Sequence, residues 1–267
     1  ALGTVLAQVV ITVESIGPGN QNWDGIVIEH TSIVNQFTHC ILEHARFPLT
    51  LKTFYSTGSN TTQQLLLSNS IIRHCETGVL ANTNYLVTLA ENEIYDFSFA
   101  GIGYGGGTGL VEIVCNRVYN GPSRGTYTFM GTADAYIAEN EIFGIYNGVG
   151  IRPYQDQTGY VIVENNIVYQ CEKGISETPL GPNPTCLIRN NIVFDNDIGM
   201  SFTGEGGAEV EMNVIFGNGI GLNQWSSSFG TPSKVSYNIL YNNQSNFSPQ
   251  FNLPFAGQII TVKGRLN

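Results

Sequence analysis

The sequence predicts an all-β protein that folds as a parallel β-helix of about nine coils, some of them incomplete. An asparagine, followed two residues later by an aliphatic and then usually by an aromatic residue, recurs at steps of 22 to 26 residues. Eight or nine residues after most of these asparagines comes a glycine. No segment keeps a helical periodicity long enough for a crossover helix, so each period reads as three short strands. The recurring asparagines are Asn69, Asn92, Asn116, Asn140, Asn166, Asn191, Asn213 and Asn238.

The recurring asparagine predicts a ladder at one inward corner of the coils. Stacked amide side chains hydrogen-bond to one another and to the bent backbone, which pairs polar groups that a tight corner would otherwise bury. Asparagine also tolerates the left-handed backbone conformation found at such bends. We therefore expect a structural role for this asparagine ladder rather than ligand binding. Asn69 is expected to be a rung, and His39 to fill the equivalent slot one coil upstream.

The repeat predicts a single domain over residues 1–267, because the coils of a solenoid form one array. Residues 1–22 are expected to form an N-terminal strand or cap, residues 23–245 the coils, and residues 246–267 a C-terminal cap or strand.

The aromatic residue at the end of each frame forms a second column. Strict alternation along a strand points this position outward, but no member is strongly polar, which favours a buried corner stack. We expect the column to lie in the core, with Leu42 and Ile72 continuing it upstream. Its members are Tyr95, Tyr119, Phe143, Tyr169, Phe194, Phe216 and Tyr241.

On these residues the chain resembles the right-handed parallel β-helix repeat of the pectate-lyase-like superfamily. The resemblance rests on Asn-x-Ile followed by Gly-Ile, and it covers roughly residues 23–245. Trp-x-Gly-Ile at 23–26, leading to His-Cys-Ile at 39–41, is similar to the opening coils of secreted bacterial and archaeal β-helix domains. The resemblance implies the fold and an extracellular or cell-surface location. It does not imply one function, because that superfamily holds lyases, hydrolases, epimerases, adhesins and inert scaffolds.

The composition argues against two classes of partner. The formal net charge is −10 and charged residues make up 12% of the chain, without a basic stripe, so a nucleic-acid partner is not expected. No apolar run approaches the roughly 18 residues of a membrane-spanning helix, so membrane insertion is not expected either. The five cysteines lie at different phases of the repeat, too far apart for disulfides, and are expected to be free and mostly buried thiols.

No cofactor is expected, because the metal-binding and catalytic sets of enzymes with this fold are not recognisable. Pectate-lyase-type calcium sites need several acidic side chains on one face. The nearest approach is the short acidic run from Asp195 to Asp197, which reads as a solvated turn and gives Ca²⁺ only weak support.

One cluster of titratable residues is denser than the rest. Glu43 and Arg73 share a phase in adjacent coils, and so do His44 and His74, which places the two imidazoles about 5 Å apart. Asp96 is expected to continue the Glu43–Arg73 column. Two imidazoles near a carboxylate and a guanidinium could serve as base, acid and anion clamp. The alternative, which we favour, is an ion-pair ladder on a solvated flank.

A second candidate surface comes from the residues after the Gly-Ile strands, which read as loops rising on neighbouring coils. Aromatic faces there could stack on sugar rings, while arginine and carboxylates hold hydroxyl or uronate groups. The alternative is that these side chains only cover the flank of the helix. The residues are Tyr104, Tyr127, Arg152, Tyr154, Asp156, Glu177, Glu205 and Trp225.

The leading functional interpretation is an extracellular, non-catalytic β-helix that serves as a structural, adhesive or self-assembling surface module. Residues 3–14 and 257–263 both read as strands, so the chain could associate with itself end to end. The alternatives are a polysaccharide-active enzyme, a lyase or epimerase acting on acidic glycans, and a glycan-binding module without turnover. The sequence leaves the choice open.

Overall fold

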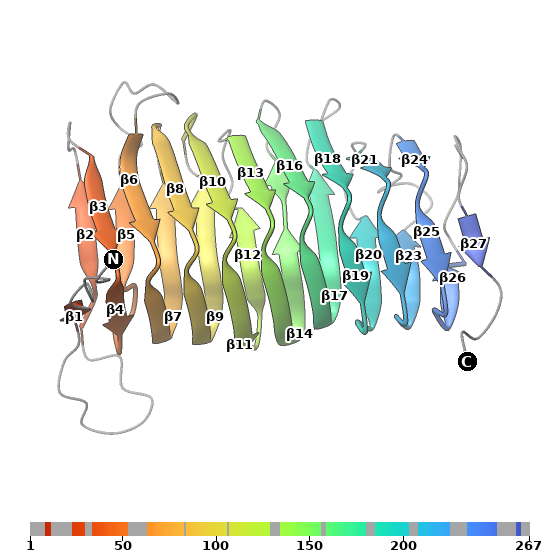
Figure 1. Cartoon of the computed structure of the whole chain (residues 1–267), viewed down its shortest axis with the longest axis horizontal. Coiled ribbons are helices and arrows are strands. Elements are labelled where there is room, and N and C mark those ends of the chain that lie inside the picture. Colours follow the sequence, from red (N-terminus) through yellow and green to blue (C-terminus); the bar gives the residue numbers. More distant parts are fainter. Residues whose placement is uncertain are drawn as a thin grey trace, which may run out of the picture.

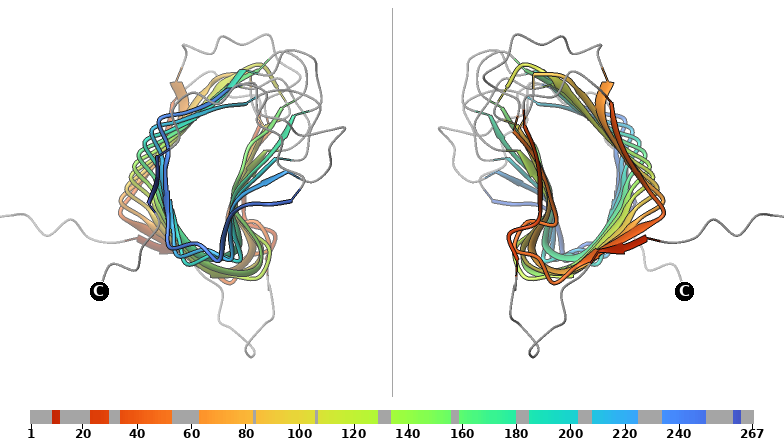
Figure 2. Two further views of the ribbon diagram at one scale, coloured as in Figure 1. Left: turned by 90° about the vertical axis from the view of Figure 1, so that its right-hand side faces the viewer. Right: turned by 90° about the vertical axis from the view of Figure 1, so that its left-hand side faces the viewer.

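The computed structural model shows a solenoid of parallel strands that follow one another in sequence order along the long axis of the molecule (Figure 1). Viewed along that axis, the coils lie behind one another around a single interior (Figure 2). The described residues are 9–11, 23–29, 34–52, 63–82, 84–105, 107–128, 134–155, 159–179, 185–202, 208–224, 234–249 and 260–262. The predicted β-helix is therefore confirmed.

One wall of the solenoid is a nine-stranded sheet to which each coil contributes one strand. Its strands are β3 (Asn35–Thr38), β6 (Gln63–Ser68), β8 (Leu86–Ala90), β10 (Leu110–Val114), β13 (Asp134–Ala138), β16 (Tyr160–Glu164), β18 (Thr185–Arg189), β21 (Ala208–Glu211) and β24 (Lys234–Ser236). The stack amounts to about seven turns, slightly fewer than the nine coils expected.

The rest of each coil belongs to an eighteen-stranded sheet, which takes the segments before and after a second corner. Its strands are β1 (Val9–Ile11), β2 (Ile26–Glu29), β4 (Cys40–Glu43), β5 (Leu49–Lys52), β7 (Ile71–Asn82), β9 (Glu93–Gly105), β11 (Arg117–Gly121), β12 (Arg124–Thr128), β14 (Glu141–Arg152), β15 (Tyr154–Gln155), β17 (Ile167–Pro179), β19 (Ile192–Phe194), β20 (Ile198–Phe202), β22 (Val214–Phe216), β23 (Ile220–Gln224), β25 (Ile239–Tyr241), β26 (Ser245–Phe247) and β27 (Ile260–Val262). The described residues contain no helix that could span a membrane.

The core consists of aliphatic columns that continue from coil to coil. Leu89, Ile113 and Ile137, for example, are in register on β8, β10 and β13, and all three are fully buried. Burying one such side chain is worth about 1.5–3 kcal/mol relative to leaving it exposed. A strict repeat therefore extends the core by a fixed amount with every coil.

Two corners of the coil depend on left-handed backbone conformations. Nine non-glycine residues with φ between 50° and 59° precede the ladder position, and seven more, joined by Gly144 and Gly217, lie at the second corner. Few side chains accept such a conformation readily, which favours Asn, Asp, His and Gly at these positions. The second corner is formed by His44, His74, Asp96, Asn120, Gly144, Gln170, Asp195, Gly217 and Asn242.

The asparagine ladder is confirmed from Asn92 to Asn238. Each side-chain Nδ2 donates to the Oδ1 of the next rung at 2.9–3.1 Å, and each backbone N–H donates to that same oxygen. All of these rungs are buried. The corner therefore carries a continuous line of satisfied amides through the protein.

The predicted upstream end of the ladder was wrong by one residue. Ser70, not Asn69, occupies the rung position, because the backbone N–H of Ser70 donates a hydrogen bond to Asn92 Oδ1 at 3.1 Å. In the preceding coil the N–H of Cys40 donates to Ser70 Oγ at 3.1 Å. Asn69 and His39 are the left-handed residues just before these slots, a conformation that both residue types tolerate.

A second, shorter ladder was not predicted. Asn196 donates to Asn218 at 3.0 Å and Asn218 to Asn243 at 3.0 Å, while the N–H of Cys171 donates to Asn196 Oδ1. The signal was present in the sequence, since each of these asparagines follows a rung of the first ladder by five residues. It ends where bulkier or apolar residues replace asparagine in earlier coils.

The aromatic column lies on the outside of the solenoid, so the predicted core position was wrong. Each ring is half-buried, whereas its aliphatic neighbour along the strand, such as Ile142 beside Phe143, is fully buried. Successive rings stack at 4.8–5.0 Å between centroids with interplanar angles of 1–11°. Mutual stacking, together with Arg117 over Tyr119 and Phe143, covers the rings without burying them in the core.

Candidate functional site

The titratable cluster lies on the outside of the second corner, where β4, β7 and β9 lie side by side. His44 and His74 stack with ring centroids 5.1 Å apart, which confirms the spacing expected from strand geometry. Both residues have a left-handed backbone, with φ of 58° and 54°. The bend therefore presents both imidazoles to the outside of the corner, and 41% of the His74 side chain is exposed.

Glu43 and Arg73 form the ion pair that their shared phase predicted. Arg73 Nε donates to Glu43 Oε2 at 2.7 Å, and Arg73 Nη1 donates to the Tyr95 hydroxyl at 3.0 Å. These hydrogen bonds, the one to Tyr95 first, raise the pKa of the Arg73 guanidinium. The indole N–H of Trp23 donates to the backbone carbonyl of Glu43 at 3.2 Å, which ties an earlier coil to the same point.

The upstream continuation of the aromatic column also differs from expectation. The strand register aligns Glu43 with Arg73 and Arg73 with Tyr95, so the ion pair extends the column. Leu42 and Ile72 belong to the neighbouring inward column and are fully buried.

Asp96 belongs to the histidine column and not, as predicted, to the Glu43–Arg73 column. Its Oδ2 lies 3.5 Å from Nδ1 of His74, and Asn120 Nδ2 donates to its Oδ1. The register explains the correction, because it pairs Arg73 with Tyr95 and so places Asp96 in line with His74.

A carboxylate beside an imidazole can orient that ring for acid–base chemistry, and His74 with Asp96 has this arrangement. The arginine side chains of the cluster are hydrogen-bonded to residues of neighbouring coils. Arg73 binds Glu43 and Tyr95, and Arg46 Nε donates to Glu76 at 3.0 Å. The contacts run between coils along an exposed corner. This geometry matches an ion-pair ladder better than a catalytic constellation, in which a group must be aimed at a bound substrate.

The predicted sugar-binding groove after the Gly-Ile strands is contradicted at three of its eight positions. Tyr104 is fully buried, Glu177 is 2% exposed and Tyr127 is 6% exposed. The strands run further than expected, β9 to Gly105 and β17 to Pro179. Alternation then turns Tyr104 and Glu177 inward, two residues after buried Ile102 and Ile175.

Of the other members of that set, the structure describes Arg152 and the backbone of Tyr154. Arg152 is half-buried at the end of β14, and Tyr154 lies in β15, whose backbone pairs with β17. Asp156, Glu205 and Trp225 lie outside the described residues. Burial raises the pKa of the Glu177 carboxyl well above its usual value, which reflects its position in the core.

The exposed aromatic column does not provide a sugar-stacking platform. The two faces of each inner ring are covered by the rings above and below it, so only ring edges and tyrosine hydroxyls face solvent. The hydroxyls of Tyr119 and Tyr169 donate to Glu93 and Glu141 at 2.8 and 2.9 Å. The column joins neighbouring coils in the same way as the ion pairs do.

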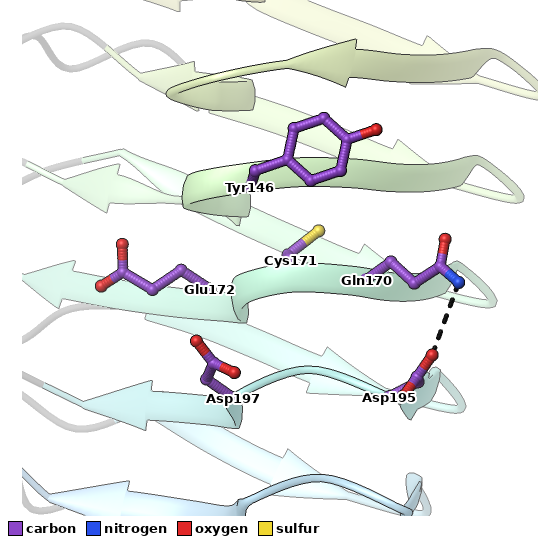
Figure 3. Close-up of a pocket in the computed structure, with 6 residues that line it drawn as sticks. All are labelled: Tyr146, Gln170, Cys171, Glu172, Asp195 and Asp197. Atoms are coloured by element: carbon purple, nitrogen blue, oxygen red, sulfur yellow. Dashed lines mark hydrogen bonds between the residues drawn. The ribbon is translucent and has the colours of Figure 1, made fainter.

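A recess opens further along the second corner, three coils beyond Asp96 (Figure 3). It has a volume of about 490 Å³ and is lined by Tyr146, Gln170, Cys171, Glu172, Asp195 and Asp197. Gln170 Nε2 donates to Asp195 Oδ2 at 3.5 Å across two adjacent coils. The predictions considered only the acidic run within this set and missed the recess, which forms from residues of three different coils.

The described part of the chain holds no group of three or more His, Cys, Asp or Glu side chains that could bind a metal ion. Its five cysteines are free, with Cys115 exposed and the other four buried, as the sequence predicted. Burial raises the pKa of the Cys75 and Cys171 thiols to about 12, so these sulfurs pack as small apolar groups.

Comparison with known proteins identifies the fold and nothing more specific. A model of the right-handed β-helix region matches residues 54–245, which is well over half of the chain. Neither the curated proteins nor the solved structures gave a significant match. The match spans the coils that carry both the asparagine ladder and the aromatic column. The chain therefore belongs to the right-handed β-helix family.

Proposed function

We propose that this β-helix is a non-catalytic module that acts outside the cell as a structural or adhesive surface. The observation that carries the proposal is that the candidate catalytic side chains are bound to side chains of neighbouring coils. Arg73 is held by Glu43 and Tyr95, and Asp96 is placed between His74 and Asn120. These contacts hold successive coils together, and they lie on an exposed corner that does not exclude water from a reacting group.

The extracellular placement rests on the similarity of the opening coils to secreted β-helix domains. A long, rigid stack of satisfied ladders suits a surface module, because its side-chain columns stay at a fixed spacing. The proposal gives the His44–His74 stack a cohesive role at the corner and no role in turnover.

A cleavage screen tests the proposal against the polysaccharide-active alternative, a lyase or epimerase. Purified protein is incubated with acidic and neutral polysaccharides, and new reducing ends, unsaturated uronates and epimerised residues are recorded. The matched variant is His44→Asn/His74→Asn, because asparagine keeps the left-handed bends favourable. We expect no product with either protein. Product that disappears in the double variant, at an unchanged unfolding midpoint, would establish the enzyme instead.

Self-association is a second candidate, and the terminal strands favour it. β1 pairs in parallel with β4, and β27 in parallel with β25, which places strands from both terminal segments in the eighteen-stranded sheet. A strand at a sheet edge offers backbone groups for pairing with another chain. Electron microscopy over a range of concentrations decides the matter. Filaments with an axial repeat about as long as one β-helix support assembly, and single particles at every concentration remove this candidate.

A further inference from the structure

We propose that the recess beside Tyr146 is a binding subsite for a positively charged, hydroxyl-rich ligand, with an amino sugar as the ligand class. The inference deepens the proposed adhesive role and rests on it, since binding without turnover is what such a role requires. It assigns the contact to the second corner and not to the groove that the sequence suggested.

The recess is built by the alternation of side chains around the corner. Gln170 and Asp195 occupy the left-handed position of their coils, and Glu172 and Asp197 follow two residues later. The residue between them in the first of these coils, Cys171, turns inward, is 4% exposed, and lies at the floor of the recess (Figure 3). Two rows of polar side chains therefore flank a floor that the buried Cys171 forms.

Tyr146 supplies the aromatic wall. It is 64% exposed and lies on the coil before Cys171, with its ring above that residue in Figure 3. Its hydroxyl lies 3.5 Å from Asn120 Oδ1, but within the described part of the chain its ring stacks on no other aromatic ring. Unlike the rings of the aromatic column, it keeps a face available for the C–H face of a sugar or for an ammonium group.

The negative charge of the residues that line the recess favours a positively charged ligand. Glu172, Asp195 and Asp197 contribute three carboxylates, and none of the six lining residues is basic. Lys173 Nζ forms an ion pair with Glu172 Oε1 at 3.6 Å, and 41% of the Glu172 side chain is exposed. The whole chain carries a formal net charge of −10, which adds to the attraction for a cation.

An organic cation fits this lining better than a metal ion. The described carboxylates do not form a metal-binding group, whereas a ligand with several donors can reach acceptors on separate coils while stacking on Tyr146. The volume of about 490 Å³ lies within the roughly 300–1,000 Å³ typical of small-molecule sites. An amino sugar combines the charge, the hydroxyl groups and the flat apolar face that the recess can use.

The experiment measures binding of glucosamine oligosaccharides by calorimetry at low ionic strength and mildly acidic pH, where the amine is protonated. N-acetylglucosamine and glucose oligosaccharides of equal length serve as uncharged probes. The test variants are Tyr146→Ala and Asp195→Asn/Asp197→Asn. The controls are Tyr160→Ala, which removes another exposed tyrosine, and Glu29→Gln/Glu91→Gln, which removes two charges elsewhere.

We expect saturable binding of the glucosamine probe alone, weakened roughly five- to tenfold or more by either test variant and unchanged by the controls. No binding, equal binding of the uncharged probes, or equal weakening by the controls would each overturn the subsite. Insensitivity to Tyr146→Ala would overturn it too, since it would indicate general attraction to an acidic protein. Chromatography of the probe keeps the two proposals apart: cleavage products contradict the non-catalytic role, whereas absent binding leaves that role standing.

Discussion

The guanidinium of Arg73 donates a hydrogen bond to the hydroxyl of Tyr95 at 3.0 Å, which joins the ion pair of the early coils to the aromatic column. The register places Glu43, Arg73 and Tyr95 in one line on the outer face of the eighteen-stranded sheet. That line continues as stacked rings as far as Tyr241. One outer column thus changes its chemistry from charge to aromatic stacking while serving the same purpose, the cohesion of parallel coils at strand spacing.

Replacing Phe143 with alanine is expected to lower the free energy of unfolding by roughly 2–3 kcal/mol, although the ring is only half-buried. The variant loses two stacked neighbours, Tyr119 and Tyr169, and the cation–π contact with Arg117. Denaturant unfolding measures the change. Tyr160→Ala, at an exposed tyrosine outside the column, is the control and is expected to cost under about 1 kcal/mol. Equal losses would contradict a cohesive role for the column.

Asn166 tests the ladder at its centre. Its amide donates to the carbonyls of Ile137 and Glu164 and to Asn191, and its Oδ1 accepts from Asn140. Asn166→Ala leaves several buried groups without partners and is expected to cost about 3 kcal/mol or more in unfolding free energy.

The adjacent Asn165 provides the matched control for the ladder. It is exposed and has φ of 57°, which aspartate also tolerates, so Asn165→Asp is expected to change stability by less than about 0.5 kcal/mol. Comparable losses in the two variants, measured by denaturant unfolding, would contradict a specific contribution of the amide ladder to stability.

Two glycines are expected to differ in how well they tolerate substitution. A Cβ on Gly148 would lie 1.6 Å from the carbonyl oxygen of Ser123 in the neighbouring coil, so Gly148→Ala forces adjacent backbones apart. Gly217 has φ of +67° and only one atom within 4 Å of the added Cβ, at 3.9 Å, so Gly217→Asn fits the bend. Thermal unfolding should show a large loss of Tm for the first variant and little change for the second. A tolerated Gly148→Ala would contradict the close coil contact.

Glu177 is expected to make stability fall as pH rises. Burial raises the folded-state pKa of its carboxyl above the ordinary 4.5, so above pH 4.5 the unfolded state releases the proton more readily than the folded state. Stability is therefore lost progressively as pH rises toward the folded-state pKa. Glu177→Gln should raise Tm at neutral pH and reduce this slope, whereas Glu91→Gln, at an exposed position, should leave it unchanged. A steeper slope in Glu177→Gln would refute the assignment.

Thiol titration of the native protein should show one reactive cysteine and four unreactive ones. Cys115 is exposed, with its Sγ 3.3 Å from Glu139 Oε2, whereas Cys40, Cys75, Cys171 and Cys186 are buried. We expect one thiol to react in the native protein and all five after denaturation without reductant. Fewer than five after denaturation would reveal a disulfide, and Cys115→Ser should remove the native signal.

The sequence by itself determined the solenoid, the main ladder and the spacing of the histidine pair. Each depends on the repeat period, and a constant period fixes which residues meet on neighbouring coils, as the 5.1 Å stack of His44 on His74 demonstrates. The sequence also contained the signal for the second ladder, because Asn196 follows Asn191 by the same five residues that separate Asn218 from Asn213.

Two features came from the tertiary structure and not from the sequence pattern. They are the direction in which several side chains point and the residue at which each coil bends relative to the repeated asparagine. A shift of one residue exchanges the inner and outer faces of a strand. Ser70 therefore takes the rung expected of Asn69, and Asp96 joins His74. The end of a strand is not marked by the period, so Tyr104 turned inward where a loop was expected. The recess beside Tyr146 needs residues from three coils, and only their arrangement in space brings them together.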